Sequence, residues 1–328
     1  MRAARVTAFG GPEVLVTAEA PDPVAGPGEV VIAVAVVDTI FVQTQVRAGW
    51  GLEYFPVRPP YILGGGVAGT VRSVGEGVDA GWTGRRVVAS IGITGGSAEL
   101  VATPVESLVP VPDGVPFTTA AAVFQDGVTA LALMDLTEVT AGERVLITGA
   151  SGGMGTLMVQ LAEARGAYVV GVARGERKTA LVRELGADAV IDGAQENWPA
   201  RARDALGATG ADVVLDGVGG ETGLAAFPLT ADGGRFSAHG APTGGFAPVE
   251  ARRAADRKIR LLGIADVQIP QRESVRLAAQ ALTETAAGRL RPVIGGTFPL
   301  DKAADAHRAI EGRGLLGKVL LTVRGADD

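Results

Sequence analysis

The segment Val145-Leu-Ile-Thr-Gly-Ala-Ser-Gly-Gly-Met-Gly155 is the most informative part of the sequence, because it joins a predicted strand to a predicted helix through a run of glycines. Residues 144–148 are an apolar run of strand length, and residues 155–165 carry apolar side chains at helical spacing. Gly152 and Gly153 would let a backbone approach a pyrophosphate, and Gly155 would let helix and strand pack closely. The helix N-terminus favours phosphate through its free N–H groups. The loop therefore predicts a dinucleotide site that includes Ala150, Ser151, Gly152, Gly153, Met154 and Gly155.

The segments that follow the glycine loop alternate between strand and helix. Further strands are predicted at residues 168–173, 189–191, 212–215, 235–238 and 260–264, with a helix at 176–185. Such alternation is typical of a parallel sheet with right-handed crossovers, and six strands complete a dinucleotide-binding fold. The fold class is therefore α/β with a doubly wound parallel sheet. The alternative is that the loop only caps a helix, since the chain has 48 glycines.

The regions on either side of this sheet have a different pattern. Residues 1–120 contain short β segments, such as 30–37 and 85–91, separated by Gly and Pro, which predicts a β-rich, partly open barrel. After Gly263 we expect helices at 271–287 and 301–311 and a final strand at 318–323.

The composition of the chain excludes several kinds of site and several classes of partner. The 328 residues suffice for two domains, and the absence of cysteine excludes disulfides, cysteine-ligated zinc, iron–sulfur clusters and thiol nucleophiles. Two histidines leave little for a metal site, and a net charge of −6 argues against a general nucleic-acid surface. No apolar run has the length of a membrane span, and the N-terminus lacks a signal-peptide hydrophobic region. We therefore expect a cytoplasmic protein without metal, nucleic-acid or membrane partners.

The turn after the second strand of the predicted sheet bears on the type of dinucleotide. Sites for NAD usually place Asp or Glu there, whereas this turn reads Ala173-Arg-Gly-Glu-Arg-Lys178. Arg174 and Lys178 could hold a 2′-phosphate, which favours NADPH as the cofactor. The alternative is that both are solvated cations at the start of a helix, partly neutralised by Glu176.

Motifs along the whole chain resemble those of one enzyme superfamily. They are Phe9-Gly-Gly-Pro-Glu-Val-Leu15, Gly26-Pro-Gly-Glu-Val30, Gly69-Thr-Val-Arg-Ser-Val-Gly-Glu-Gly-Val78, the glycine loop, Leu185-Gly-Ala-Asp188, Asp212-Val-Val-Leu-Asp-Gly-Val-Gly-Gly220 and Gly317-Lys-Val-Leu320. In this order they resemble the medium-chain dehydrogenase/reductase superfamily, most closely its zinc-free quinone oxidoreductase branch.

The resemblance implies a split architecture. A GroES-like catalytic domain, formed by residues 1–120 and 265–328, would accompany a Rossmann domain at residues 121–264. The resemblance also implies an NADPH-dependent two-electron reduction between the two domains, usually by a homodimer.

This chain departs from the superfamily at the catalytic positions. The first zinc-ligand position of zinc-dependent relatives falls at Ile40, and their Gly-His-Glu motif becomes Gly64-Gly65-Gly66. Without a metal there is no Lewis acid to polarise an alcohol, so we do not expect alcohol dehydrogenase activity. The quinone branch usually has Asn near Ile40 and Asp near Gln43. Here Ile40, Phe41 and Val42 are apolar, and with Trp50 we interpret them as a hydrophobic substrate pocket.

Few groups could stabilise the developing charge on an acceptor oxygen or donate a proton to it. Tyr54 is a candidate proton donor, and an aromatic wall with Trp50 and Phe55 is the alternative. Thr129 matches a family position beside the nicotinamide, and a helix-interior threonine bonded to the backbone is its alternative.

Four more residues complete the predicted cofactor site. Val218 lies in the motif after one strand, and His239 and Gly240 follow another at the carboxyl edge of the sheet, where ligands gather. A structural role is the alternative for His239. Lys318 could reach the cofactor, although a lysine at the start of a strand is usually solvated. The other histidine, His307, lies in a predicted helix and is expected at the surface.

These features predict a zinc-independent, NADPH-dependent reductase of a hydrophobic quinone or α,β-unsaturated carbonyl compound. One alternative is a stereospecific enoyl reductase of a biosynthetic pathway. Another is a catalytically silent NADPH-binding or sensor protein. Quinone and enone acceptors both stay open at this point.

Overall fold

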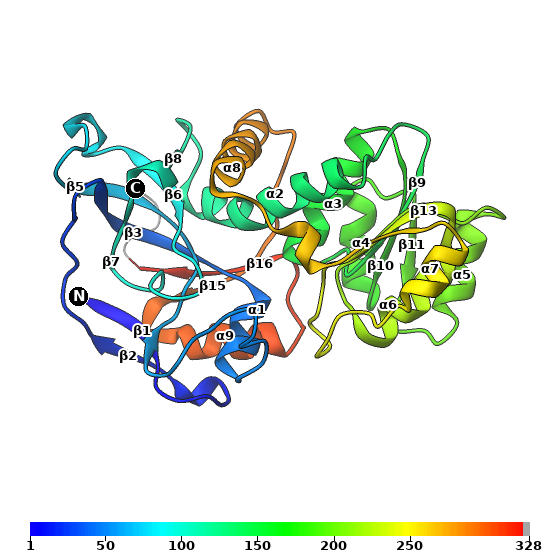
Figure 1. Cartoon of the computed structure of the whole chain (residues 1–328), viewed down its shortest axis with the longest axis horizontal. Helices are drawn as coiled ribbons and strands as arrows, with labels where there is room; N and C mark the ends of the chain where they lie inside the picture. The colour runs from blue at the N-terminus through cyan, green and yellow to red at the C-terminus, as the bar shows by residue number, and fades with distance from the viewer. Residues whose placement is uncertain (324–328) are drawn as a thin grey trace. The chain divides into compact units, whose positions relative to one another are not determined.

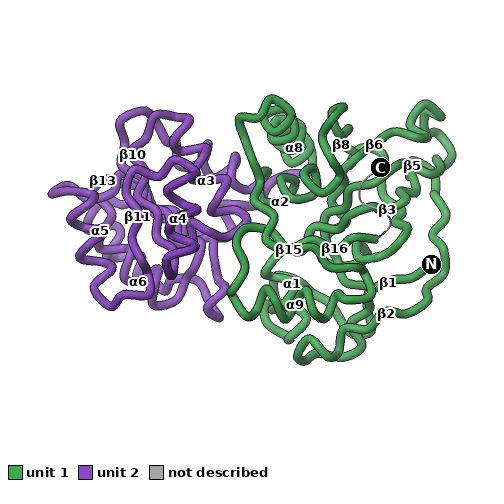
Figure 2. The backbone as a smooth tube through the Cα atoms, turned by 180° about the vertical axis from the view of Figure 1, so that it is seen from behind, with its two compact units in different colours: residues 1–128, 271–328 green, residues 129–270 purple. Residues whose placement is uncertain are grey.

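The computed structural model describes residues 1–323, which form two compact units (Figures 1 and 2). Among these residues, unit 1 comprises Met1–Val128 and residues 271–323, and unit 2 comprises Thr129–Pro270. The units thus divide after residues 128 and 270, whereas the division that the resemblance implied lies after residues 120 and 264. Helix α2 (Phe117–Leu136) continues across the first division.

Unit 2 is a doubly wound parallel α/β fold, as the alternation of strands and helices predicted. Its strands are β9 (Arg144–Thr148), β10 (Tyr168–Ala173), β11 (Ala189–Asp192), β12 (Ala211–Asp216), β13 (Thr230–Ala238) and β14 (Arg260–Leu262). Its helices are α3 (Gly153–Ala164), α4 (Glu176–Glu184), α5 (Trp198–Leu206), α6 (Gly220–Ala226) and α7 (Ala251–Asp256). The strand order is β11-β10-β9-β12-β13-β14, so the winding reverses between β9 and β12. Ligands of open α/β sheets bind beyond the carboxyl ends of the strands at such a reversal.

Helices cover both faces of this sheet (Figure 1). Val170 and Val172 of β10 belong to a core cluster that also holds Trp198 of α5, Ala226 of α6 and Ala254 of α7. Residues alternate between the two faces of a strand, so the glycine between those valines faces the other side. There a Cβ at Gly171 would lie 2.4 Å from Val182 of α4. Both faces of the sheet are therefore buried, which explains the continuous apolar runs.

Unit 1 is β-rich. Its strands are β1 (Arg2–Val6), β2 (Leu15–Glu19), β3 (Glu29–Thr39), β4 (Tyr61–Ile62), β5 (Gly66–Val74), β6 (Arg86–Ser90), β7 (Leu100–Pro104), β8 (Val109–Pro110), β15 (Ile294–Pro299) and β16 (Lys318–Thr322). Its other helices are α1 (Phe41–Arg47), α8 (Gln271–Ala286) and α9 (Ala303–Glu311). One sheet has the order β2-β1-β4, and a larger one runs β15-β16-β3-β5-β6-β8.

The long strand β3 organises unit 1. One edge of β3 pairs with β5, and the other pairs with β7 over residues 29–33 and with β16 over residues 36–39. These pairings are antiparallel, whereas β15 joins β16 in parallel. Ala303 and Ala306 of α9 and Leu321 of β16 lie in the same apolar cluster as Val30 of β3. The end of the chain therefore completes the core of its first segment.

Several elements were absent from the sequence prediction, among them α1, β15 and α5. Residues 41–47 form helix α1, whose start is supported by a hydrogen bond from the Ile40 amide to Gln43 Oε1 at 3.1 Å. Strand β15 has two glycines, and its exposed and half-buried residues lack a clear strand alternation. Helix α5 begins at Trp198 with Pro199 in its first turn. Each is short and becomes regular through tertiary packing, which overrides local propensity.

The prediction of a surface position for His307 was wrong. Its side chain in α9 is fully buried, and its Nδ1 lies 3.3 Å from Nη1 of the buried Arg47. Arg47 also donates to the Gly10 carbonyl at 3.1 Å and to Glu311 at 2.5 Å. The contact between α1 and α9 therefore encloses a polar cluster that the pattern of α9 alone did not indicate.

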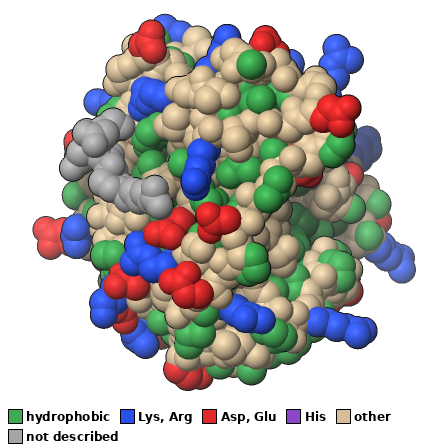
Figure 3. Space-filling model, turned by 90° about the vertical axis from the view of Figure 1, so that its left-hand side faces the viewer, with side chains coloured by type: hydrophobic (Ala, Val, Ile, Leu, Met, Phe, Trp, Pro, Cys, Tyr) green, Lys and Arg blue, Asp and Glu red, His purple; other side chains and the backbone are tan. Residues whose placement is uncertain are grey.

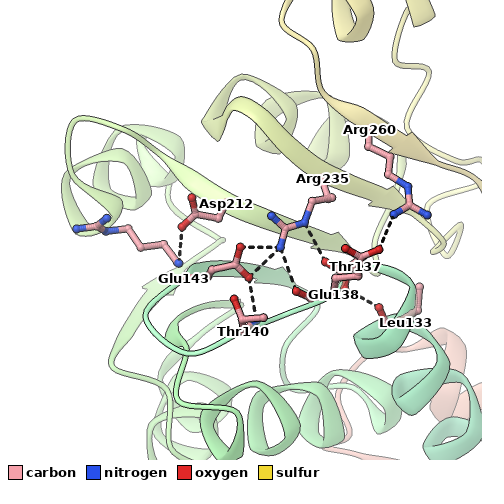
Figure 4. A network of polar contacts seen from close by, with 9 residues as sticks. Leu133, Thr137, Glu138, Thr140, Glu143, Asp212, Arg235 and Arg260 are labelled. Carbon is pink, nitrogen blue, oxygen red and sulfur yellow. Dashed lines mark hydrogen bonds and ion pairs between the residues drawn. The ribbon is translucent and has the colours of Figure 1, made fainter.

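Arg235 joins the segment after α2 to the sheet of unit 2 (Figure 4). Its Nε donates to the Thr137 carbonyl at 2.9 Å, and its Nη2 donates to both carboxylate oxygens of Glu143 at 2.7 and 2.8 Å. Burial alone would raise the pKa of Glu143, but hydrogen bonds from Arg235 and the Thr140 amide outweigh it and hold the pKa below its usual value. These contacts fix the end of α2 beside the first strand of the sheet.

Two further observations concern the apolar helix α2 and the charged side chains on the surface. Within residues 1–323, α2 is the one helix long and apolar enough to cross a membrane by length and composition, and 72% of that window is buried. A core helix passes the same test. On the face drawn in Figure 3, acidic and basic side chains are interspersed.

Candidate functional site

The glycine loop lies where β9 ends and α3 begins. Gly149 has a φ of +66°, and the Gly152 amide donates to the Gly149 carbonyl at 3.0 Å, which closes a tight turn. A Cβ at Gly155 would lie 2.3 Å from the Gly149 oxygen, so only glycine lets α3 pack this closely. Gly152 is exposed, and its Cβ would meet nothing closer than 3.4 Å. The start of α3 is therefore open to an anionic ligand.

The residues of the glycine loop differ in how accessible they are to a ligand. Ala150 is fully buried, so this residue could offer a ligand only its backbone, and Ser151 is 6% exposed. Gly153 and Met154 are half-buried. The loop is thus a backbone cradle, which agrees with its lack of charged side chains.

Asp216 at the end of β12 fixes the neighbouring loop. Its buried carboxylate accepts a 2.6 Å hydrogen bond from the Thr148 hydroxyl and further bonds from the amides of Val218 and Gly219 at 3.1 Å. Burial raises the pKa of Asp216, and these hydrogen bonds counter that effect in part. A Cβ at Gly149 would lie 3.1 Å from Val218 Cγ2, so the predicted Val218 borders the glycine loop.

His239 and Gly240 follow β13 at the same edge of the sheet. His239 is 8% exposed, and its Nδ1 lies 3.1 Å from the Ser237 hydroxyl. Its Nε2 is buried without a hydrogen-bond partner among residues 1–323. Burial lowers the pKa of His239 to about 4, so the ring is neutral at physiological pH. A Cβ at Gly240 would lie 2.1 Å from the Gly217 carbonyl carbon, which explains the glycine.

The turn after β10 carries the predicted cations. Arg174 is exposed and Lys178 is half-buried in the first turns of α4. The nearby carboxylate of Asp192 accepts bonds from the amides of Gly175 and Ala194, each at 2.9 Å. Asp192 therefore shapes the turn, and these backbone hydrogen bonds lower its pKa. The structure thus brings the loop residues, Val218, His239 and Gly240 to one edge of unit 2, with Arg174 and Lys178 after the adjacent strand.

Of the residues predicted to act on the acceptor, those of the apolar pocket and Tyr54 lie in unit 1, whereas Thr129 is the first residue of unit 2. Ile40, Phe41 and Val42 are half-buried at the start of α1, and Trp50 is half-buried after it. Tyr54 is 54% exposed. The Arg313 guanidinium lies 5.9 Å from the centre of the Phe41 ring, a neighbour that the sequence patterns did not indicate. Thr129 lies on α2 and is half-buried.

Lys318 is not a solvated lysine. Its side chain is 4% exposed, and its Nζ lies 2.6 Å from Asp38 Oδ1 and 3.0 Å from Asp126 Oδ2. Sequence reasoning did not single out either aspartate. The signal was present at Asp38, a charged residue within an apolar strand, because buried charges are rare unless paired.

Gly64, Gly65 and Gly66, which we expect to correspond to the Gly-His-Glu motif of zinc-dependent relatives, lie where larger side chains do not fit. A Cβ at Gly64 would lie 2.1 Å from the Ile93 carbonyl carbon, and one at Gly66 would lie 2.7 Å from Phe124. Gly65 has a φ of +139°. Within the described part of the chain, no group of three or more His, Asp or Glu side chains could hold a metal ion.

Comparison with known proteins covers nearly the whole chain. Residues 26–113 match the alcohol dehydrogenase GroES-like domain family, and residues 153–284 match the zinc-binding dehydrogenase family. The quinone oxidoreductase of Rattus norvegicus is 32% identical, over 98% of this chain and 97% of its own length. The 2-haloacrylate reductase of a Burkholderia species is 30% identical, over 95% of this chain and 96% of its own length.

The fold of this chain is also similar to that of a solved structure. A mycobacterial protein complexed with NADPH has a TM-score of 0.89 at 32% identity, over 98% of this chain and 100% of that chain.

Proposed function

Because the chain belongs to the quinone oxidoreductase branch of the medium-chain dehydrogenase/reductase superfamily, we propose that it is a zinc-independent, NADPH-dependent reductase. Its acceptor is a hydrophobic quinone or α,β-unsaturated carbonyl compound. The observation that carries the proposal is the glycine cradle between β9 and α3, with the neutral His239 at the same sheet edge.

The residues of this edge fit a dinucleotide. Gly152 leaves open space at the start of α3, where the amides of the first turn face outward and would hold the pyrophosphate. His239 offers an unpartnered, buried Nε2 that fits a cofactor hydroxyl or amide. Asp216 holds the adjacent loop so that Val218 and Gly240 would border the nucleotide. When bound, NADPH supplies the hydride for the acceptor.

Arg174 and Lys178 would select the 2′-phosphate. No acidic residue follows β10 directly, and Asp192 is occupied by two backbone amides. Arg174→Ala should therefore raise the KM for NADPH about tenfold or more, the loss of one charge-assisted contact, and leave the KM for NADH unchanged. Arg183→Ala, on a later turn of α4, is the matched control. A wild-type preference for NADH would contradict the assignment.

Zinc independence is supported by the chain's own residues. Ile40 has no metal-binding atom, and Gly64, Gly65 and Gly66 have neither donor side chains nor the space for them. Enzyme dialysed against a chelator should keep its full rate, and loss of activity that zinc restores would contradict this part of the proposal.

The acceptor pocket would be formed by Ile40, Phe41, Val42 and Trp50, whose apolar side chains exclude water. Tyr54 and Thr129 are the hydroxyl groups proposed to act on the acceptor. Tyr54→Phe tests the first of them: an unchanged kcat would make Tyr54 part of an aromatic wall. The 2-haloacrylate reductase relative supports carbon–carbon double bonds as acceptors, and with them the alternative of an enoyl reductase.

Oxidation of NADPH across a panel of quinones, enones and enoyl thioesters tests the function. We expect turnover with at least one neutral, flat acceptor. NADPH binding in a fluorescence titration without turnover on any acceptor would instead indicate a silent binding or sensor protein.

The proposed homodimer follows from the resemblance alone. We propose a cytoplasmic homodimer with small-molecule acceptors and without nucleic-acid or membrane partners. Light scattering coupled to size-exclusion chromatography should give twice the chain mass of 33.2 kDa. A monomer at that mass would contradict the proposed assembly.

A further inference from the structure

Three ionisable side chains meet inside unit 1. Asp38 near the end of β3 is fully buried, Lys318 at the start of β16 is 4% exposed, and Asp126 of α2 is 17% exposed. The Lys318 ammonium joins the two carboxylates, at 2.6 Å from Asp38 Oδ1 and 3.0 Å from Asp126 Oδ2. The three groups thus form a chain of contacts within hydrogen-bonding distance, from a buried end to an accessible end.

The surroundings of Asp38 contain few other charges. Lys318 from β16 and Asp126 from α2 are the charged groups that act on it. Strand β5 places Gly66 opposite Asp38, and α1 contributes the neutral Gln43 beside Gly65. With both aspartates ionised, the cluster would hold one more negative than positive charge. An unbalanced buried charge is costly, so an additional proton on the cluster is favoured.

The protonation of the two buried groups follows from this balance. Burial, with a smaller contribution from Asp126, raises the pKa of Asp38 to about 7, although Lys318 opposes the shift. Burial alone would lower the pKa of Lys318, but Asp126 and Asp38 outweigh it and raise that pKa. The lysine therefore stays an ammonium ion, while Asp38 gains or loses a proton near neutral pH.

The accessible end of the cluster lies close to a proposed site residue along the chain. Asp126 and Thr129 are three residues apart on α2, so they share one side of that helix. The buried end lies two residues before Ile40. Near it, Thr39 Oγ1 and Gln43 Nε2 are buried without hydrogen-bond partners among residues 1–323. Asp126 is thus the member of the cluster through which a proton can leave.

We propose that Asp38, Lys318 and Asp126 form a proton store that supplies the proton consumed with each hydride. This inference rests on the proposed reductase function. Lys318 passes one of its protons to the Asp126 carboxylate and takes the Asp38 proton in exchange. Asp126 then gives its proton to the acceptor anion formed by hydride addition. The cluster loses one proton and gains one negative charge, and solvent restores that proton through Asp126.

The pH dependence of kcat tests the store. At saturating NADPH and acceptor, kcat should fall about tenfold per pH unit above about pH 7, as the store empties. Asp38→Asn keeps the size of the side chain but cannot titrate, so it should lower kcat and remove this fall. The fall would persist in Asp38→Asn if the store were not its cause.

Two further variants show whether the cluster transfers protons or only stabilises the fold. Lys318→Arg keeps the positive charge, but a guanidinium holds its proton, so kcat should fall about 10²-fold while the KM for NADPH stays the same. Asp126→Ala should lose a similar factor and regain activity with added formate. Asp305→Asn, a change in an exposed ion pair of α9, is the control. Full activity of folded Lys318→Arg, or no rescue of Asp126→Ala, would overturn the proposal.

Infrared spectroscopy of the wild-type protein decides the question without turnover. The protonated carboxyl band of one aspartate should disappear with a midpoint near pH 7, and this band should be absent in Asp38→Asn. Absence of any protonated carboxyl above pH 5 would overturn the store. If no acceptor is reduced, the proposed function fails, and the infrared titration still reports on the cluster.

Discussion

Both histidines of the chain are buried, and each is neutral for a physical reason. Burial lowers the pKa of His239 to about 4. Burial and then the positive charge of Arg47 lower the pKa of His307 to about 3. Neither ring can act as an acid near neutral pH, which leaves His239 as a neutral hydrogen-bonding group for the proposed cofactor.

These values predict how stability depends on pH. The unfolded chain binds protons at its histidines near pH 6.5, and the folded chain does not until about pH 4, so the free energy of unfolding falls as pH falls through this window. His239 alone accounts for up to about 3 kcal/mol of that loss. In urea titrations, the difference in the free energy of unfolding between pH 7 and pH 4.5 should be smaller for His239→Gln than for the wild-type protein.

Nuclear magnetic resonance provides a direct check of the two histidines. Their two ring-proton signals should not titrate between pH 5.5 and 8 in the folded protein. A midpoint near the ordinary histidine pKa for either signal would contradict the neutral, buried assignment.

For single residues, the sequence predicted roles that depend on nearby residues better than burial that depends on distant ones. The glycines of the loop could be assigned because their reason is local: Gly155 faces the backbone a few residues before it. His307 was expected at the surface, and Lys318 at the cofactor or in solvent, because the residues that enclose them, Arg47 and Asp38, lie far away in the sequence. Long-range partners leave no mark in local periodicity.

At the scale of elements, the packing of α3 on β9 can be tested by adding one methyl group. Gly155→Ala places a Cβ 2.3 Å from the Gly149 oxygen, so the helix must shift. We expect a loss of about 2–3 kcal/mol in the free energy of unfolding and of NADPH binding. Gly152→Ala is the matched control, since its Cβ has room and its φ is −77°. It should fold normally, and equal destabilisation by both variants would contradict the packing argument.

The contacts between the end of α2 and the sheet of unit 2 predict that two arginine substitutions differ in their effect on stability. Arg235→Met leaves the half-buried Glu143 carboxylate and the Thr137 carbonyl without their donor, so it should cost about 1–3 kcal/mol. Arg260→Met removes an ion pair with Glu138 whose side chains are 51% and 76% exposed, and should cost under about 0.5 kcal/mol. Thermal denaturation of both variants measures the difference. An equal effect would mean that burial does not strengthen the Arg235 contacts.

The strands of unit 2 were predictable because most of them are buried on both faces and so form continuous apolar runs. The predicted 168–173 strand coincides with β10 (Tyr168–Ala173). In unit 1, α1 and β15 depend on neighbours such as α9 and β16, so their sequences alone carry little periodicity. The doubly wound sheet was therefore derived from the sequence pattern. That residues 265–328 belong with the first segment of the chain was an expectation from the resemblance, and the pairing of β16 with β3 was not predicted.

At the scale of the molecule, two groups of residues carry the proposed function. One is the sheet edge of unit 2, with the glycine cradle, Asp216 and His239. The other is the segment of unit 1 that runs from Asp38 into α1, with Lys318 paired beside it. The sequence indicated the glycine cradle and His239 of the first group, but not Asp216, and it indicated the apolar part of the second group. It did not indicate the buried charges, because Asp38, Asp126 and Lys318 come from three distant segments.

Oxidation of NADPH by chelator-treated enzyme, with neutral quinones and enones as acceptors, tests the proposed reductase function without an intermediate assumption. We predict turnover with at least one of them, at a kcat/KM for NADPH at least tenfold above that for NADH. Absence of turnover with every acceptor, activity that requires added zinc, or a preference for NADH would contradict the account.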